Sequence, residues 1–238
     1  MNADRAAGAA LKQVRGAGRH FTKLARSVYS GPIAADLREA IIAGELAEGT
    51  PLVETRLAEE LAVSRGPVRS ALHVLEGEGL VRTMPNGRMV AVGFHTEDLR
   101  DLLDVRYELE SLAITKGIAN ETNPRPVADA FATMLGEGAS TLRLVDLDVD
   151  FHRTLVEFSG SRFLVQSWLA VAPVIHTVIT IGNRTLVARD PQSNFDRIVS
   201  SHRTLVDAVC ASNVDAATAM LAEQFRFTSS MFSGRDGA

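Results

Sequence analysis

Residues 51–92, PLVETRLAEELAVSRGPVRSALHVLEGEGLVRTMPNGRMVAV, constrain the fold more than any other part of the chain. Apolar residues recur with helical spacing over 54–63 and 65–79, so two short helices with a turn between them are expected. Two β-prone runs then flank Pro-Asn-Gly, and Asn-Gly is a strong hairpin signal. A further amphipathic helix is expected over 30–46. Helix, helix, turn, helix and hairpin, in that order, predict a winged helix-turn-helix.

The second helix of such a motif enters the DNA major groove with its N-terminal end. Ser64 is expected to cap this helix. Arg65 and Arg69 follow at i, i+4 on the leading face, where guanidinium groups suit guanine edges or phosphates. Gly66 lets the backbone approach closely. Arginines on an outer helix face are often merely solvated, but their place in the leading turn favours DNA contact.

Charge is divided unevenly along the 238 residues: residues 1–92 hold 12 basic and 10 acidic side chains, and the remainder holds 13 and 19. This division fits a front half that faces nucleic acid. Residues 1–29 lack a secretory signal and are expected to form a flexible basic arm. A single cysteine, Cys210, excludes an intramolecular disulfide and fits a cytoplasmic protein. No apolar run approaches the roughly 18 residues of a membrane span, so no membrane partner is expected.

Residues 51–81 resemble the signature of the GntR-type bacterial transcription regulators, PG-x-x-L-x-E-x-x-LAE-x-LGVSR-x-PVREAL-x-x-LE-x-EGLV. The resemblance implies a DNA-binding domain over 30–92 and a homodimer on a double-stranded operator. The family often has a DNA-contacting arginine where Thr55 stands, and Arg56 points roughly 100° away along the helix. The operator sequence is therefore open. The DNA-binding candidates are Ser64, Arg65, Gly66, Arg69, Thr55, Arg56 and, in the wing, Gly87.

The rear half shows helical periodicity and no convincing strand. Helices are expected near 97–119, 126–136, 141–159, 162–181, 192–211 and 213–232. The fold class is therefore mainly α, with the winged helix followed by an all-α antiparallel bundle over 97–232 that binds an effector and dimerises.

The pentapeptide HRTLV occurs twice, beginning at His152 and at His202. Asp148 lies one helical turn before His152, and all three residues fall on or beside apolar stripes. Polar side chains facing the core from several helices are what a site inside a bundle requires, and a carboxylate and an imidazole can share one cation. The alternatives are a hydrogen-bonded core histidine or an ordinary i, i+4 pair.

The segment DVDFHRTLVEFSGSRFL resembles the D-x-x-FH-x-x-L-x-x-x-SGN-x-x-L motif of the FadR-like subgroup, whose rear domain is the FCD ligand-binding domain. The resemblance implies a divalent ion beneath the effector, held by Asp148, His152, His202 and the residue at position 224. That residue is usually histidine and is Gln224 here. Glutamine is a poorer ligand than imidazole for Zn²⁺ or Ni²⁺, so Zn, Ni or Mn all remain candidates. The adjacent Glu223 is expected to point elsewhere.

Two further residues are effector candidates. Arg106 interrupts an apolar stripe, so it either meets an effector carboxylate or pairs internally with Glu110. His176, in an almost wholly apolar helix, is either a polar pocket residue or a hydrogen-bonded core residue. The sequence thus predicts a transcription regulator that responds to a small organic acid and is not an enzyme. The alternatives are a metal-dependent hydrolase using Asp148, His152 and His202, and a regulator that binds its ligand without metal.

Overall fold

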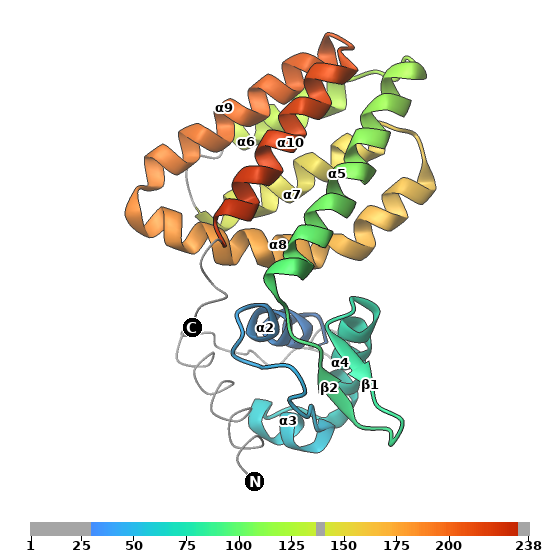
Figure 1. Cartoon of the computed structure of the whole chain (residues 1–238), viewed down its shortest axis with the longest axis vertical. Helices are drawn as coiled ribbons and strands as arrows, with labels where there is room; N and C mark the ends of the chain where they lie inside the picture. Colours follow the sequence, from blue (N-terminus) through green and yellow to red (C-terminus); the bar gives the residue numbers. More distant parts are fainter. Residues whose placement is uncertain (1–29, 137–140, 233–238) are drawn as a thin grey trace. The chain divides into compact units, whose positions relative to one another are not determined.

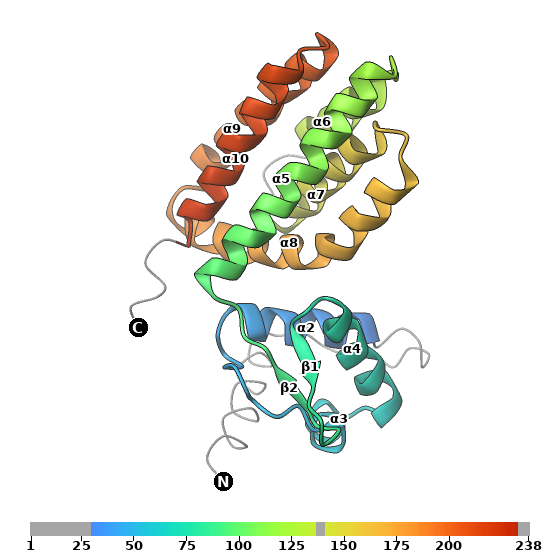
Figure 2. The same ribbon diagram turned by 45° about the vertical axis from the view of Figure 1, so that its right-hand side comes forward.

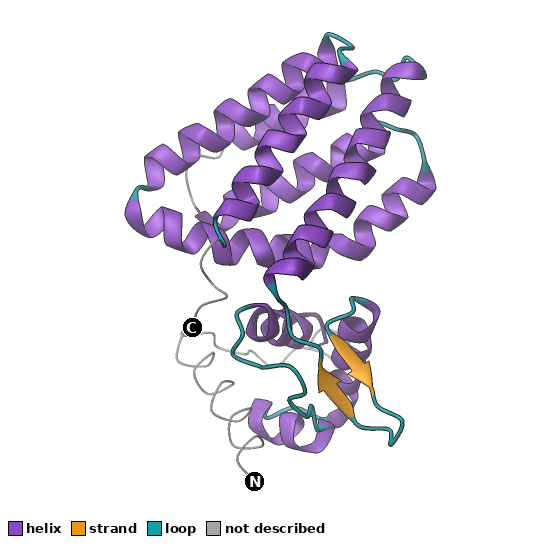
Figure 3. Cartoon of the chain, in the orientation of Figure 1, coloured by secondary structure: helices purple, strands orange, loops and turns teal. Residues whose placement is uncertain are grey.

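The structure is a computed structural model that describes residues 30–136 and 141–232, and the chain divides into two compact units between His95 and Thr96. The predicted fold class is confirmed: the described residues are mainly helical, with one small hairpin (Figure 3). The flexible arm expected over 1–29 lies outside the described residues.

The first unit contains helices α2 (Ser30–Ile42), α3 (Glu54–Leu61) and α4 (Arg65–Gly77) and strands β1 (Val81–Thr83) and β2 (Met89–Ala91). Helix α4 packs against both α2 and α3, and β1 pairs antiparallel with β2 (Figure 1). The apolar stripes of the three helices meet between them and form the core of the unit. Its fully buried members include Leu37, Ile41, Val68, Leu72 and Leu75.

The turn between α3 and α4 is closed by backbone groups. Ala62 adopts a left-handed conformation, φ 55°, and its N–H is directed to the carbonyls of Ala58 and Glu59. Ser64 is the N-cap residue of α4, as predicted, and has the extended backbone of that position, but its exposed side chain makes no capping hydrogen bond. The N–H groups of the first turn of α4 therefore have no partner in the Ser64 hydroxyl.

The wing loop depends on one glycine. Gly87 has φ 76° and donates its N–H to the Met84 carbonyl at 2.8 Å, while the Met84 N–H donates to the Arg88 carbonyl at 2.8 Å. Asn86 does not share the positive φ, so the loop is not the two-residue type I′ turn that Asn-Gly usually forms. A side chain at position 87 would be strained in this conformation.

The second unit is a bundle of helices in antiparallel contact. Its described residues contain no strand, and α10 packs against α5 and α9, while α7 packs against α6 and α8 (Figures 1 and 2). The helices are α5 (Thr96–Ala119), α6 (Arg125–Gly136), α7 (Thr141–Glu157), α8 (Arg162–Arg189), α9 (Pro191–Cys210) and α10 (Val214–Ser230). Helix α8 continues past residue 181, where it was expected to end, and stops only before Asp190 and Pro191.

Helix α8 is the most unusual element of the bundle. It contains Pro173 in its interior, and the Thr177 hydroxyl donates to the Pro173 carbonyl at 3.0 Å. Its Arg162–Arg184 segment is long and apolar enough to span a membrane by length and composition, which the sequence analysis missed. Because Trp168 is fully buried in the bundle, we interpret this segment as a core helix. Its outer face nevertheless exposes Phe163 at 69%.

The N-cap residues of α4 and α10 are expected to contribute differently to the stability of the protein. Asn213, at the N-cap of α10, accepts a hydrogen bond from the Ala216 N–H at 3.0 Å, whereas Ser64 makes none. Asn213→Ala is expected to lower the free energy of unfolding by about 1 kcal/mol, and Ser64→Ala by less than about 0.5 kcal/mol. Denaturant titration followed by circular dichroism measures both. A loss for Ser64→Ala equal to that for Asn213→Ala would contradict the observed capping.

Candidate functional site

The leading turn of α4 presents the two arginines that the sequence singled out. Arg65 and Arg69 are exposed, and both guanidinium groups reach the carboxylate of Glu54 at the start of α3. Arg69 donates from Nε and Nη2 at 2.8 and 2.9 Å, and Arg65 donates from Nη2 at 3.3 Å. The hydrogen bond from Arg69 is the main cause that holds the pKa of Glu54 below its ordinary value. Glu54 therefore occupies the donors of the two arginines that the sequence predicts to contact DNA.

The other predicted DNA contacts are more dispersed. Thr55 is exposed on α3, while Arg56 donates from Nε to Glu60 at 3.0 Å and so lies along its own helix. Gly66 is exposed, and a side chain there would meet no other group within 4 Å, so packing inside the chain does not require a glycine. Gly87 lies at the exposed tip of the wing beside Arg88, a basic residue that the sequence analysis did not consider.

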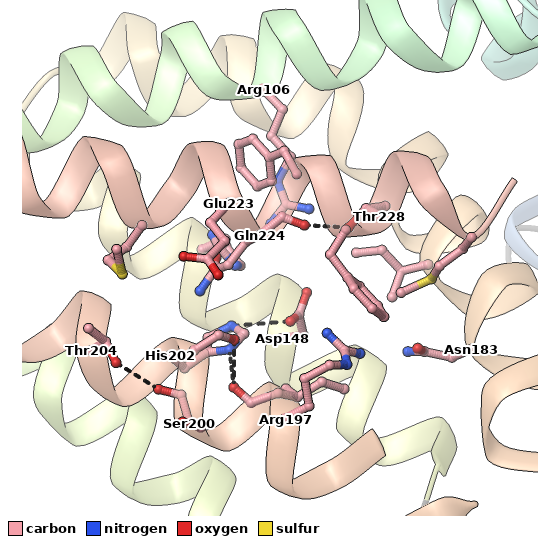
Figure 4. Close-up of a pocket in the computed structure, with 18 residues that line it drawn as sticks. Arg106, Asp148, Asn183, Arg197, Ser200, His202, Thr204, Glu223, Gln224 and Thr228 are labelled. Carbon is pink, nitrogen blue, oxygen red and sulfur yellow. Dashed lines mark hydrogen bonds and ion pairs between the residues drawn. The ribbon is translucent and has the colours of Figure 1, made fainter. Parts of the chain in front are cut away.

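In the second unit, α7 and α9 bring together three of the residues predicted to bind a metal. Ligand atoms of Asp148, His152 and His202 all lie within 4.8 Å of one another. Figure 4 shows Asp148 and His202 directed toward each other. Both histidines are buried, and the Asp148 side chain is 13% exposed. His202 Nε2 lies 3.1 Å from Asp148 Oδ1 but has no partner in hydrogen-bond geometry. The periodicity that placed these residues on core-facing stripes is consistent with their positions here.

Hydrogen bonds behind the cluster set the tautomer of each imidazole. His202 Nδ1 lies 2.8 Å from the Ile198 carbonyl, which can only accept, so Nδ1 carries the proton and the Nε2 of a neutral ring presents a lone pair. His152 Nδ1 lies 2.6 Å from Glu110 Oε2 and leaves Nε2 free in the same way. Lone pairs on two imidazoles and a carboxylate therefore face one small volume, an arrangement that a cation would stabilise.

Glu110 on α5 links this cluster to Arg106. Both residues are fully buried, and Arg106 Nε donates to Glu110 Oε1 at 2.8 Å. Burial alone would raise the pKa of Glu110, but its contacts with His152 and Arg106 hold that pKa below its ordinary value. Burial, together with the charge of Arg106, lowers the pKa of His152 and keeps the imidazole neutral at pH 7. Sequence reasoning found Glu110 only as a partner for Arg106 and missed its contact with His152.

Arg106 thus pairs with Glu110 of its own helix, which was one of the two roles predicted for it. Its guanidinium carbon lies 4.4 Å from the centre of the Phe225 ring and 5.4 Å from that of Trp168. It also lines the cavity described below, and its Nη2 has no hydrogen-bond partner. One donor therefore remains available beside the cluster.

Gln224 on α10 borders the cluster, and both polar atoms of its amide are buried without a hydrogen-bond partner. Burial of unsatisfied donors and acceptors is costly, so these atoms favour a ligand or an ion beside them. Glu223 also lines the cavity, which contradicts the expectation that it points elsewhere (Figure 4). Its side chain is exposed, so two adjacent positions of α10 reach the cavity.

A cavity of about 360 Å³ adjoins the cluster and is bordered by residues of α5, α7, α8, α9 and α10. This volume suits a small metabolite. Asn183 of α8 and Arg197 of α9 line it, and neither was singled out from the sequence. His176 is not among the lining residues: its side chain is 41% exposed and lies 2.8 Å from Asp146 Oδ1. Both predicted roles for His176, in the pocket or in the core, are therefore replaced by a surface pair.

Comparison with known proteins identifies both units. Residues 30–90 match the model "Bacterial regulatory proteins, gntR family", and residues 101–227 match the FCD domain. The gluconate operon transcriptional repressor of Bacillus licheniformis is 26% identical over 208 residues, 85% of this chain and 84% of that protein. The uncharacterized HTH-type transcriptional regulator BphR of Paraburkholderia xenovorans is 34% identical over 195 residues, 78% of this chain and 77% of that protein.

A solved structure of E. coli McbR/YncC has the same fold, with a TM-score of 0.63 and 19% identity over 88% of this chain and 99% of that one. The matched families and the named relatives are transcription regulators and not enzymes, so the hydrolase alternative falls. This chain belongs to the gntR family of bacterial regulatory proteins: it is a DNA-binding transcription regulator whose second unit is an FCD domain.

Proposed function

We propose that the second unit senses a small organic acid through a divalent ion held by Asp148, His152 and His202, with Gln224 as a fourth ligand. The observation that carries this proposal is the convergence of two imidazoles and one carboxylate whose ligand atoms lie within 4.8 Å of one another, with both Nδ1 atoms held from behind. Asp148 supports it further, because its pKa lies well below the usual range despite burial, owing first to contact with His202. The carboxylate is therefore ionised and ready to bind a cation at neutral pH.

The donor set fits a first-row divalent ion. The unpartnered amide of Gln224 offers a carbonyl oxygen where an imidazole would favour Zn²⁺ or Ni²⁺, so we infer a preference for Mn²⁺ among Zn, Ni and Mn. Such an ion supplies a positive charge and open coordination positions for a carboxylate. Glu110 and the Ile198 carbonyl fix the orientation of the two imidazoles from behind.

An organic acid is the effector that best suits this site. The ion and the unpartnered Nη2 of Arg106 both favour an anionic oxygen. The name of one relative, the gluconate operon transcriptional repressor, refers to a sugar acid, which is consistent with this chemistry. If the ligand has different affinities for two conformations of the protein, and these conformations bind the operator differently, ligand binding shifts the population and so changes the operator affinity.

We further propose that the regulator acts as a cytoplasmic homodimer on a pseudo-palindromic operator. Exposed apolar side chains of α8 support self-association, because Phe163 and Leu169 are exposed at 69% and 43% on a helix of mainly apolar composition. Large exposed apolar side chains close together on a surface are typical of an interface. Two winged helices would then contact two half-sites.

Metal analysis of protein purified without a histidine tag tests the proposal. The wild type is expected to hold one divalent ion per chain after dialysis against Mn²⁺, and Asp148→Ala is expected to hold none. Asp150→Ala is the matched control, because Asp150 is exposed on the same helix, and should retain the ion. Gln224→His is expected to raise the affinity for Zn²⁺ relative to Mn²⁺, since imidazole replaces an amide oxygen.

Two results would contradict this proposal. Equal metal content in the wild type and in Asp148→Ala would show that the cluster does not hold the ion. Binding of an organic acid by metal-free wild type with undiminished affinity would favour the regulator that binds its ligand without metal.

A further inference from the structure

The cavity has a second polar region that the metal cluster does not use. Asn183 projects into it from α8 and Arg197 from α9, and Figure 4 shows their polar ends directed toward each other, beside the cluster of Asp148 and His202. The two residues lie on different helices and have no polar contact with His152, His202 or Gln224. This region therefore needs its own explanation.

Arg197 forms no ion pair of its own, and Asp148, a member of the metal cluster, is the carboxylate whose charge acts on it. Its Nη2 donates to the Asn194 side-chain carbonyl at 2.7 Å, and its guanidinium carbon lies 3.4 Å from the centre of the Phe227 ring. Both partners are neutral, and no carboxylate among the described residues forms an ion pair with Arg197. The other arginine of the cavity, Arg106, is neutralised by Glu110. A divalent ion on the cluster would engage Asp148, and the partly buried guanidinium of Arg197, held in place by neutral partners, would then favour an incoming anion.

Asn183 adds an independent observation at the same place. Asn183 is only 3% exposed, and its Oδ1 atom has no hydrogen-bond partner. Polar atoms buried in this way are normally satisfied, so an unsatisfied amide at a cavity wall indicates a missing ligand or water. The amide has both donors and an acceptor, and rotation about its last bond lets it donate to a carboxylate oxygen.

The charges around the cavity specify what kind of ligand would fit. A divalent ion on Asp148 leaves one positive charge at the metal end, while Glu110 and Arg106 neutralise each other. Arg197 supplies a second positive charge at the other end. Two carboxylates are among the described lining residues: Asp148, which the ion would engage, and Glu223, which is exposed and therefore screened by solvent.

We propose that the effector is a dianion, a dicarboxylic acid that places one carboxylate at the metal end and the other on Arg197 and Asn183. This inference rests on the proposed function for the first carboxylate and extends it to the second. A ligand with a neutral hydroxyl at the far end could bind the Asn183 amide, but it would leave the charge of Arg197 uncompensated. The second subsite therefore selects for the length and charge of the acid.

Matched pairs of acids test this inference on the full-length, Mn²⁺-loaded protein. Each pair has a similar carbon chain and differs in the second carboxylate: butyrate and succinate, pentanoate and glutarate, gluconate and glucarate. Isothermal titration calorimetry is expected to give about 10- to 100-fold tighter binding for the diacid in the pair whose length fits, the range for hydrogen bonds to a charged group. Arg197→Gln is expected to lower the affinity for that diacid to the level of its monoacid, and to change the affinity for the monoacid far less.

Two further variants test whether Arg197 binds the ligand or only stabilises the fold. Arg203→Gln is the matched control: Arg203 lies on the same helix, its guanidinium carbon is 5.3 Å from the centre of the Phe131 ring, and it does not line the cavity. It should keep the full preference for the diacid. Arg197→Lys retains the charge and should keep part of it, which also shows that position 197 tolerates substitution.

The outcomes distinguish the two proposals. Metal-dependent binding of the monoacids with no preference for any diacid, or a preference that survives Arg197→Gln, would overturn the second subsite and leave the proposed function intact. Absence of Mn²⁺ binding in the titration with metal alone would instead overturn the proposed function, and the dianion inference with it.

Discussion

Replacing Glu110 by alanine is expected to lower the free energy of unfolding of the second unit by about 3–5 kcal/mol, the usual cost of leaving one charge of a buried pair without its partner. Arg106 would keep its charge at 2% exposure with no carboxylate beside it, and His152 would lose the acceptor of its Nδ1 proton. Trp168 is the single tryptophan and lies in this unit, so its fluorescence during denaturant unfolding reports on this unit alone.

The same helix provides the control for this experiment. Glu108 is exposed on α5, and Glu108→Ala should change stability by no more than about 0.5 kcal/mol. If the two variants had equal stability, Glu110 would not be the counter-charge of Arg106. A double variant, Arg106→Leu with Glu110→Leu, is expected to recover much of the loss, because it removes both buried charges.

Arg69→Ala is expected to weaken operator binding by about 10- to 100-fold, which corresponds to about 1–3 kcal/mol for one bidentate contact to a base edge. Arg69 is exposed on the leading turn of α4 and already presents two donors in parallel to the Glu54 carboxylate. DNA would replace that carboxylate with a guanine edge or a phosphate. Fluorescence anisotropy with an operator selected from a random DNA library, at one fixed salt concentration, measures the effect.

Two control measurements show which part of the DNA Arg69 contacts and whether net charge alone explains the loss. If Arg69 contacts a base, the substitution should lower the affinity for random-sequence DNA less than the affinity for the operator. If Arg69 contacts a phosphate, both affinities should fall equally. Arg153→Ala removes an exposed arginine from α7 in the other unit and controls for net charge. A loss of operator binding in Arg153→Ala as large as that in Arg69→Ala would indicate that only total charge matters.

The winged helix could be predicted because its determinants are local. Turn residues, helical periodicity and Asn-Gly lie within residues 30–92, and each acts on neighbours a few positions away. The contact between Glu54 and Arg69 could not be predicted in the same way, because it depends on the angle between α3 and α4. Nor does periodicity decide whether Ser64 turns its hydroxyl toward the helix that it precedes.

The candidate site likewise combines residues that local sequence patterns can predict with residues that they cannot. Spacing placed Asp148 and His152 one turn apart, the repeated pentapeptide and its apolar stripe singled out His202, and the resemblance added Gln224 as a ligand. The groups behind and beside them come from other helices: Glu110 lies 42 residues from His152, and Asn183 falls beyond the point where α8 was expected to end. No pattern within one helix records which neighbour it will face, so these residues required the tertiary structure.

Pro173 gives α8 an uneven stiffness along its length. Proline has no N–H to offer the carbonyl one turn earlier, and its ring crowds that turn, so a helix bends most easily at this point. Trp168 before the proline and Ile175 and Ile179 after it belong to one buried cluster. Side-chain packing on both sides of Pro173 therefore compensates for the missing backbone hydrogen bond and holds Asn183 at the wall of the cavity.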